Sequence, residues 1–138
     1  MSASQNSAPL GSMYLIDVVA RPSSDPPAVT LAKLKAIVDE ELDKLRSAPP
    51  DAREVERALN QAEASFYNRM ERIGGFGGKA DQLNGYYTAT GNPDFFNEDL
   101  SRYLALRPDD IQAAVRKWLV PDRRVEITVV PASTESGK

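Results

Sequence analysis

Apolar residues recur at helical spacing through most of the chain, whereas two short stretches near its ends have the pattern of strands. The first stripe, which includes Leu31, Leu34, Val38 and Leu42, predicts a helix with one apolar face. A longer stripe from Val55 to Ile73 predicts a helix of about 23 residues, roughly 35 Å in length. This second helix would form the backbone of the domain.

Prolines and helix-capping residues set the expected ends of the helices. Pro49 and Pro50 end the first, and Asp51, followed three residues later by Glu54, forms a capping pattern for the second. Three shorter helices are expected after it, over Lys79–Thr90, over Asp94–Leu106 and from the segment Arg107-Pro108-Asp109-Asp110 onward. The side chains expected to face inward in these helices are Ala80, Leu83, Tyr87, Phe95, Phe96, Leu100, Tyr103, Leu104, Ile111, Ala114, Val115, Trp118 and Leu119, with Tyr86 as a further candidate.

Two segments have the pattern of strands. Met13–Ala20 is mainly apolar on both alternating faces, as in a strand that is covered on both sides or lies inside a sheet. Arg123–Val130 alternates apolar and polar residues, which predicts a half-buried strand. The expected fold class is therefore α+β, with about five helices packed on one face of a mainly antiparallel sheet to which this chain supplies a first and a last strand. Because two strands do not make a stable sheet, the remaining strands should come from outside this sequence or from self-association through the strand edges.

Length and charge narrow the class of protein. The 138 residues suit one domain, here a single partial domain over residues 1–138, in which residues 1–11 are expected to be flexible or an edge segment and residues 132–138 a polar tail. A net charge of −3 disfavours nucleic acid as a partner. No apolar run long enough for a membrane span and no signal peptide is visible, so the signal of an exported parent protein would lie outside this chain.

The chain contains no histidine and no cysteine. This excludes imidazole and thiolate zinc ligands, cysteine nucleophiles and any Ser-His-Asp arrangement. The acidic run Asp39-Glu40-Glu41 could be a carboxylate site, but its helical spacing favours a solvated face. Asp17 could contact a ligand, although an ion pair near a strand end is the favoured interpretation. We expect no catalytic, cofactor-binding or metal-binding residue in this chain.

A glycine-rich stretch, Gly74-Gly75-Phe76-Gly77-Gly78-Lys79, invites comparison with a phosphate-binding loop. Such a loop follows a strand and places a hydroxyl residue after its lysine, whereas here a helix is expected to precede the glycines and Ala80 follows Lys79. The favoured interpretation is a helix stop and tight turn, since glycine readily adopts positive φ.

The order of several short motifs resembles the second half of a domain from the insulinase (pitrilysin) family of zinc peptidases, in its processing-peptidase-like branch. The resemblance covers residues 3–131, nearly the whole chain. The motifs are Gly11-Ser12-Met13-Tyr14-Leu15-Ile16-Asp17-Val18-Val19-Ala20-Arg21-Pro22, Val55-Glu56-Arg57-Ala58-Leu59-Asn60, Lys79-Ala80-Asp81-Gln82-Leu83, Thr90-Gly91-Asn92-Pro93, Leu106-Arg107-Pro108-Asp109-Asp110-Ile111-Gln112-Ala113-Ala114 and Lys117-Trp118-Leu119-Val120-Pro121.

The resemblance implies a partial LuxS/processing-peptidase-like metallohydrolase fold. It also implies a non-catalytic C-terminal domain fragment that completes the fold and the peptide-holding chamber of a metalloendopeptidase. The zinc would sit on an H-x-x-E-H motif in the N-terminal catalytic domain or subunit, which would be the main partner. A structural or partner subunit of the same family is one alternative, and a helical protein-binding module that uses the stripe from Val55 to Ile73 is another. The compartment stays open, with a bacterial periplasmic or secreted parent as one option.

Overall fold

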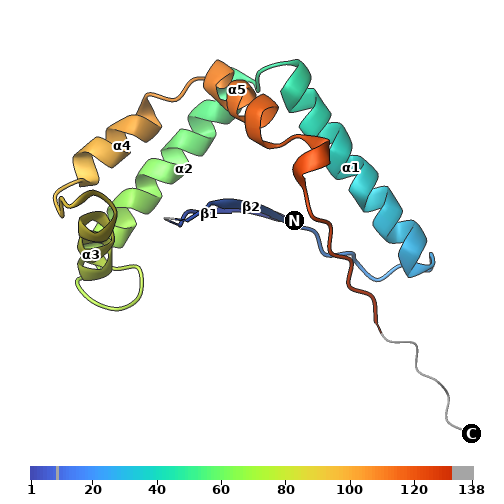
Figure 1. Cartoon of the computed structure of the whole chain (residues 1–138), viewed down its shortest axis with the longest axis horizontal. Helices are drawn as coiled ribbons and strands as arrows, with labels where there is room; N and C mark the ends of the chain where they lie inside the picture. The colour runs from blue at the N-terminus through green and yellow to red at the C-terminus, as the bar shows by residue number, and fades with distance from the viewer. Residues whose placement is uncertain (9, 132–138) are drawn as a thin grey trace, which may run out of the picture. The chain divides into compact units, whose positions relative to one another are not determined.

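The computed structural model describes residues 1–8 and 10–131 and contains, in these residues, five α-helices and a two-stranded antiparallel sheet (Figure 1). The α+β class expected from the sequence is therefore confirmed. The chain divides into two compact units. We call Arg46–Ala114 the helical unit, and Met1–Leu45 together with the chain from Val115 onward the terminal unit.

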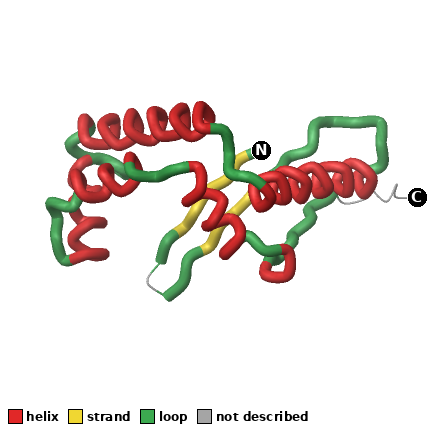
Figure 2. The backbone as a smooth tube through the Cα atoms, turned by 90° about the horizontal axis from the view of Figure 1, so that it is seen from above, coloured by secondary structure: helices red, strands yellow, loops and turns green. Residues whose placement is uncertain are grey.

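The sheet of the terminal unit is a hairpin at the start of the chain. Strand β1 (Ser2–Asn6) pairs antiparallel with β2 (Met13–Asp17), in a register that places Ser2 opposite Asp17 and Asn6 opposite Met13 (Figure 2). The sequence predicted one strand as far as Ala20 and a flexible or edge segment over residues 1–11. Instead β2 ends at Asp17, and part of the first segment is itself a strand, because the polar β1 supplies the backbone partner that β2 needs.

Within the described chain, the first predicted strand is not covered. Met13, Tyr14 and Leu15 are exposed and Ile16 is half-buried. A two-stranded hairpin is only marginally stable without a layer packed on one face. The apolar side chains of β2 are therefore available to a covering surface.

Helix α1 (Pro27–Ser47) carries the first apolar stripe. Its stripe residues are half-buried, Ile37 is exposed, and no side chain on this helix is fully buried. The helix stops just before Pro49 and Pro50, as the sequence predicted, because proline restricts the preceding residue and cannot donate a helical hydrogen bond.

Helix α2 (Ala52–Glu71) begins as its capping pattern predicts. The Asp51 carboxylate accepts a hydrogen bond of 2.8 Å from the backbone N–H of Arg53. The helix ends two residues before Ile73, which is exposed, so the predicted stripe is shorter than expected. Val55 and Phe66 are its buried residues.

Aromatic rings fill the contact between α2 and α4 (Phe96–Leu104). The Phe66 ring meets the rings of Phe96 and Tyr103 edge-on, with centroids 5.7 and 5.1 Å apart, and the Arg69 guanidinium lies 4.8 Å from the Phe66 centroid. Edge-to-face contacts of this kind add to the free energy of simple burial. Phe66 is thus the centre of the helical unit's core.

Helix α3 (Lys79–Thr90) has the predicted bounds but faces its neighbours differently from the prediction. Tyr86 is 7% exposed, whereas Tyr87 is 61% exposed and Ala80 is also exposed. Tyr86 is the inward residue because its ring packs edge-on against Phe95, at 5.8 Å between centroids, while its hydroxyl donates a 2.9 Å hydrogen bond to the Asp99 carboxylate. A buried tyrosine needs such a partner for its polar end.

Helix α5 (Pro108–Trp118) and the short 3₁₀ helix η1 (Pro121–Arg123) complete the described helices. Val115 is buried, but Trp118, expected on the inner face, is exposed and has the Lys117 ammonium 4.7 Å from its ring. The structure also corrects the predicted last strand: residues 124–130 form none with the described part of the chain. The predicted tail, residues 132–138, lies outside the described residues.

Candidate functional site

The C-terminal segment, residues 124–130, begins in extended backbone but has no strand partner among the described residues. Arg124 has φ −126° and ψ 152°, which are strand dihedrals. No backbone hydrogen bond joins this segment to another described residue. Val125, Ile127 and Val129 are 88%, 84% and 83% exposed. The alternation that predicted a half-buried strand is therefore present, but the described residues do not cover it.

Ion pairs attach the start of this segment to α1. The Arg124 guanidinium binds the Asp39 carboxylate through both terminal nitrogens and also lies 2.7 Å from Glu126. The Lys35 ammonium lies 2.9 Å from the other oxygen of Glu126. Helix α1 therefore holds two side chains of the segment: its Asp39 pairs with Arg124, and its Lys35 pairs with Glu126.

The charges of this cluster shift the ionisation of its members. The hydrogen bond to Asp39 raises the pKa of Arg124, and the hydrogen bond from Lys35, with the charge of Arg124, lowers the pKa of Glu126. Both shifts favour the charged forms. The attachment is therefore intact at neutral pH.

The three residues of the acidic run Asp39-Glu40-Glu41 form ion pairs with two different cations. Asp39 pairs with Arg124, whereas Glu40 and Glu41 both bind the Lys44 ammonium, at 2.9 and 2.8 Å. The two glutamates are thus part of a solvated face, as predicted. Asp17, the other candidate, has an exposed side chain at the end of β2, and no ion pair joins it to another described residue.

The second candidate surface is the glycine loop, Gly74–Gly78, which joins α2 to α3. Gly75 and Gly77 adopt φ of +85° and +76°, in the left-handed region that favours glycine. A Cβ on Gly78 would lie only 2.7 Å from the Gly74 carbonyl oxygen and 2.8 Å from that of Arg72. The tight turn predicted from the glycines is therefore present, and three of them are needed for its shape.

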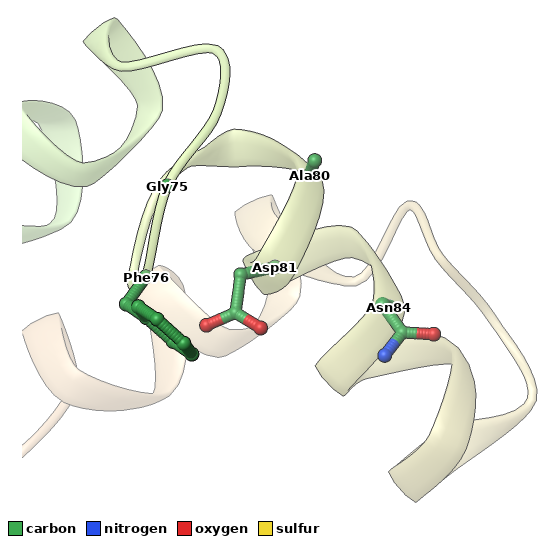
Figure 3. A pocket seen from close by; sticks show the side chains of 5 residues that line it. All are labelled: Gly75, Phe76, Ala80, Asp81 and Asn84. Carbon is green, nitrogen blue, oxygen red and sulfur yellow. The ribbon is translucent and has the colours of Figure 1, made fainter.

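A shallow hollow of about 410 Å³ lies beside this loop. Its lining residues are Gly75, Phe76, Ala80, Asp81 and Asn84, and Figure 3 shows the Phe76 ring and the Asp81 carboxylate beside each other, with the Asn84 amide farther along α3. The sequence directed attention to Gly-Lys and phosphate, but Lys79 does not line the hollow. An aromatic residue between glycines, followed by an acid in the first turn of the next helix, was the signal that could have identified it.

Residues 1–8 and 10–131 contain no cluster of three or more acidic side chains arranged to hold a metal ion. Within the same residues, none of the helices combines the length and the apolar character needed to cross a membrane.

Comparisons of the chain with protein-family models, with curated proteins and with solved structures found no match. The resemblance to the insulinase family rests on the motifs quoted above and stays a prediction.

Proposed function

We propose that this chain is a non-catalytic C-terminal part of a zinc peptidase of the insulinase type. In this role it completes the fold of the parent's C-terminal domain and contributes to the walls of its peptide-holding chamber. The zinc ligands and the glutamate base come from an N-terminal catalytic domain or subunit, since the chain has no histidine.

The observation that carries the proposal is the exposed C-terminal segment. A strand whose backbone groups and apolar face are unpaired is a template for pairing with another strand. Val125, Ile127 and Val129 project on one side of it, and the ion pairs of Arg124 and Glu126 engage the other. Partner strands added to this segment would cover the three apolar side chains and satisfy the backbone.

The small core supports the same conclusion. The fully buried apolar residues of the described chain are Val55, Phe66, Tyr86, Leu100 and Val115. A compact domain of this length buries about 68% of its unfolded surface and needs a larger core than this. The apolar faces of β2 and of the C-terminal segment are surfaces that partner strands would cover.

Of the two alternative functions, the helical binding module agrees less well with the structure than the structural subunit does. A helical binding module would present the stripe of α2 to a partner, yet Val55 and Phe66 are buried within the described chain. A structural subunit without a zinc motif in its parent fits the exposed C-terminal segment equally well. The motif H-x-x-E-H in the parent or a partner chain separates this alternative from the proposal.

The deciding experiment is to measure the size of the native product in the cells that make it, using size separation and mass spectrometry of tryptic peptides from this sequence. We expect a product well above 15.1 kDa with peptides that include H-x-x-E-H. A larger product without that motif would favour the structural subunit. A native product of about the mass of this chain, bound to no such partner, would refute the proposal.

A matched pair of variants tests the exposed segment directly. Ile127 and Ile73 are 84% and 82% exposed, so Ile127→Lys and Ile73→Lys place the same charge at equally exposed positions. We expect Ile127→Lys to prevent stable assembly with the catalytic part and to abolish peptidase activity, because a lysine would be buried between strands. Ile73→Lys should assemble as the unaltered protein does.

A further inference from the structure

Phe76 is fully exposed at the glycine loop, which is an unusual position for a large apolar side chain. It stands between two glycines in the left-handed region, and a third glycine after them admits no side chain. The local sequence therefore uses three special backbone positions to place one aromatic ring in solvent.

Hydrogen bonds fix this loop. The N–H of Lys79 donates to the Arg72 carbonyl at 2.6 Å, and the N–H of Ala80 donates to the Ile73 carbonyl at 3.3 Å, closing the base of the loop. The Asp81 carboxylate accepts the N–H of Gly77 at 3.0 Å. The ring of Phe76 is thus carried on an ordered turn whose position is coupled to Asp81.

The hollow beside the ring has a defined chemistry. It combines an aromatic face, a carboxylate with one oxygen bound to Gly77, an amide and the methyl group of Ala80, and no cationic side chain lines it (Figure 3). A carboxylate repels phosphate and other anions. An aromatic ring beside a carboxylate instead suits a flat cation, which can stack on the ring and donate to the oxygens.

We propose that this hollow binds the guanidinium group of an arginine side chain on a partner protein or peptide. The guanidinium stacks on Phe76 and donates to the Asp81 oxygen that Gly77 leaves open. Arginine is preferred over lysine because its planar group both stacks and donates in several directions. The site is independent of the exposed C-terminal segment, so either proposal can fail alone.

The test uses the full chain labelled with ¹⁵N and a blocked tripeptide, acetyl-Gly-Arg-Gly amide, added during recording of amide spectra. The control peptide carries citrulline, which has nearly the same shape without the charge. We expect saturable shifts at the amides of Gly75, Gly77 and Asp81 with the arginine peptide only. Equal shifts with the citrulline peptide, or shifts spread over all acidic surfaces, would overturn the proposal.

Two variants assign the contacts. Asp81→Asn keeps an oxygen for the N–H of Gly77 but removes the charge, and should weaken binding about fivefold or more. Phe76→Ala removes the ring and should weaken it roughly two- to fivefold. Glu56→Gln, an exposed change on α2 with the same change in net charge as Asp81→Asn, should leave the affinity unaltered. If Glu56→Gln and Asp81→Asn have the same effect, binding is non-specific attraction to an acidic protein and the proposal is wrong.

Discussion

Different forces stabilise the interior of each of the two units. In the helical unit, Phe66, Tyr86 and Leu100 are buried, and rings from α2, α3 and α4 meet edge-on. Among the described residues of the terminal unit, Val115 is the one fully buried apolar side chain, and α1 holds the C-terminal segment through exposed ion pairs.

This difference shows which part of the chain is self-sufficient. Apolar burial stabilises by roughly 25 cal/mol per Å² and is insensitive to moderate salt, whereas exposed ion pairs contribute little and are screened. The helical unit should therefore keep its structure under conditions that detach the C-terminal segment.

Phe66→Ala should have the largest effect. It removes the ring at the centre of the contact between α2 and α4, and should lower the free energy of unfolding by about 3–5 kcal/mol. Urea denaturation followed by circular dichroism measures this change. The control is Phe76→Ala, the same substitution at a fully exposed ring, which should change stability by less than about 0.5 kcal/mol. Equal effects at the two positions would contradict the assigned core.

Gly78→Ala tests the turn at the edge of the helical unit. The added Cβ would approach two carbonyl oxygens to within 2.8 Å, which forces the backbone to move and should cost about 1–3 kcal/mol. Thermal unfolding provides the measurement. Gly74→Ala is the matched control, because nothing lies within 4 Å of its Cβ and its φ is not positive, so its melting temperature should stay close to that of the unaltered chain.

Tyr86→Phe removes one hydroxyl from the core. The lost hydrogen bond to Asp99 should cost about 1 kcal/mol at neutral pH. Burial and the Asp99 carboxylate raise the pKa of Tyr86 to about 12 from its ordinary value of 10.0. Because the unfolded chain releases this proton first, the stabilisation is complete below pH 10 and is lost as the pH rises towards 12.

Chemical denaturation of both proteins across this pH range checks the sign. The unaltered chain should lose stability relative to Tyr86→Phe between pH 10 and 12. A constant difference over that interval would show that the hydroxyl does not titrate differently in the folded state.

Arg124→Gln should have the smallest effect on global stability, since it removes exposed ion pairs only. Its consequence should be local: the amides of residues 125–130 become more mobile in heteronuclear NOE measurements, while α2 and α3 do not change. Arg123→Gln, next in the chain, is the control because no described residue forms an ion pair with Arg123.

Acid should produce the same detachment in the unaltered chain. The pKa of Glu126 is lowered from 4.5 in the folded state, so its contribution is present above pH 4.5 and is lost as the pH falls through the lower, folded value. A segment that stays ordered in acid and in 1 M salt would show that forces other than these ion pairs hold it.

Local signals allowed much of the helical architecture to be predicted from the sequence. The cap at Asp51, the bounds of α3 and the start of α5 at Pro108 follow from residues within one turn of each boundary. Which face of a helix is buried depends on neighbours distant in sequence. Tyr86 faces inward because Asp99 and Phe95 lie opposite it, so Tyr87 at the next position is exposed.

The strands and the hollow were harder to predict for the same reason. Residues 124–130 have a strand pattern, but a strand requires a partner backbone that no described residue provides. β1 has little β-propensity, and its pairing with β2 depends on the turn between them. The hollow requires the glycine loop to fold back so that Phe76 and Asp81 lie on one side.

The exposed C-terminal segment also has a consequence for the protein's handling by the cell. Val125 to Val130 combine high β-propensity, little charge and no proline, which is the composition of segments that stack into cross-β fibrils. A chain that leaves this segment uncovered is exposed to aggregation and to the proteases and chaperones that remove unassembled proteins. The segment that would pair with the partner would then also expose unassembled copies to removal. The abundance of the chain would therefore follow the supply of that partner.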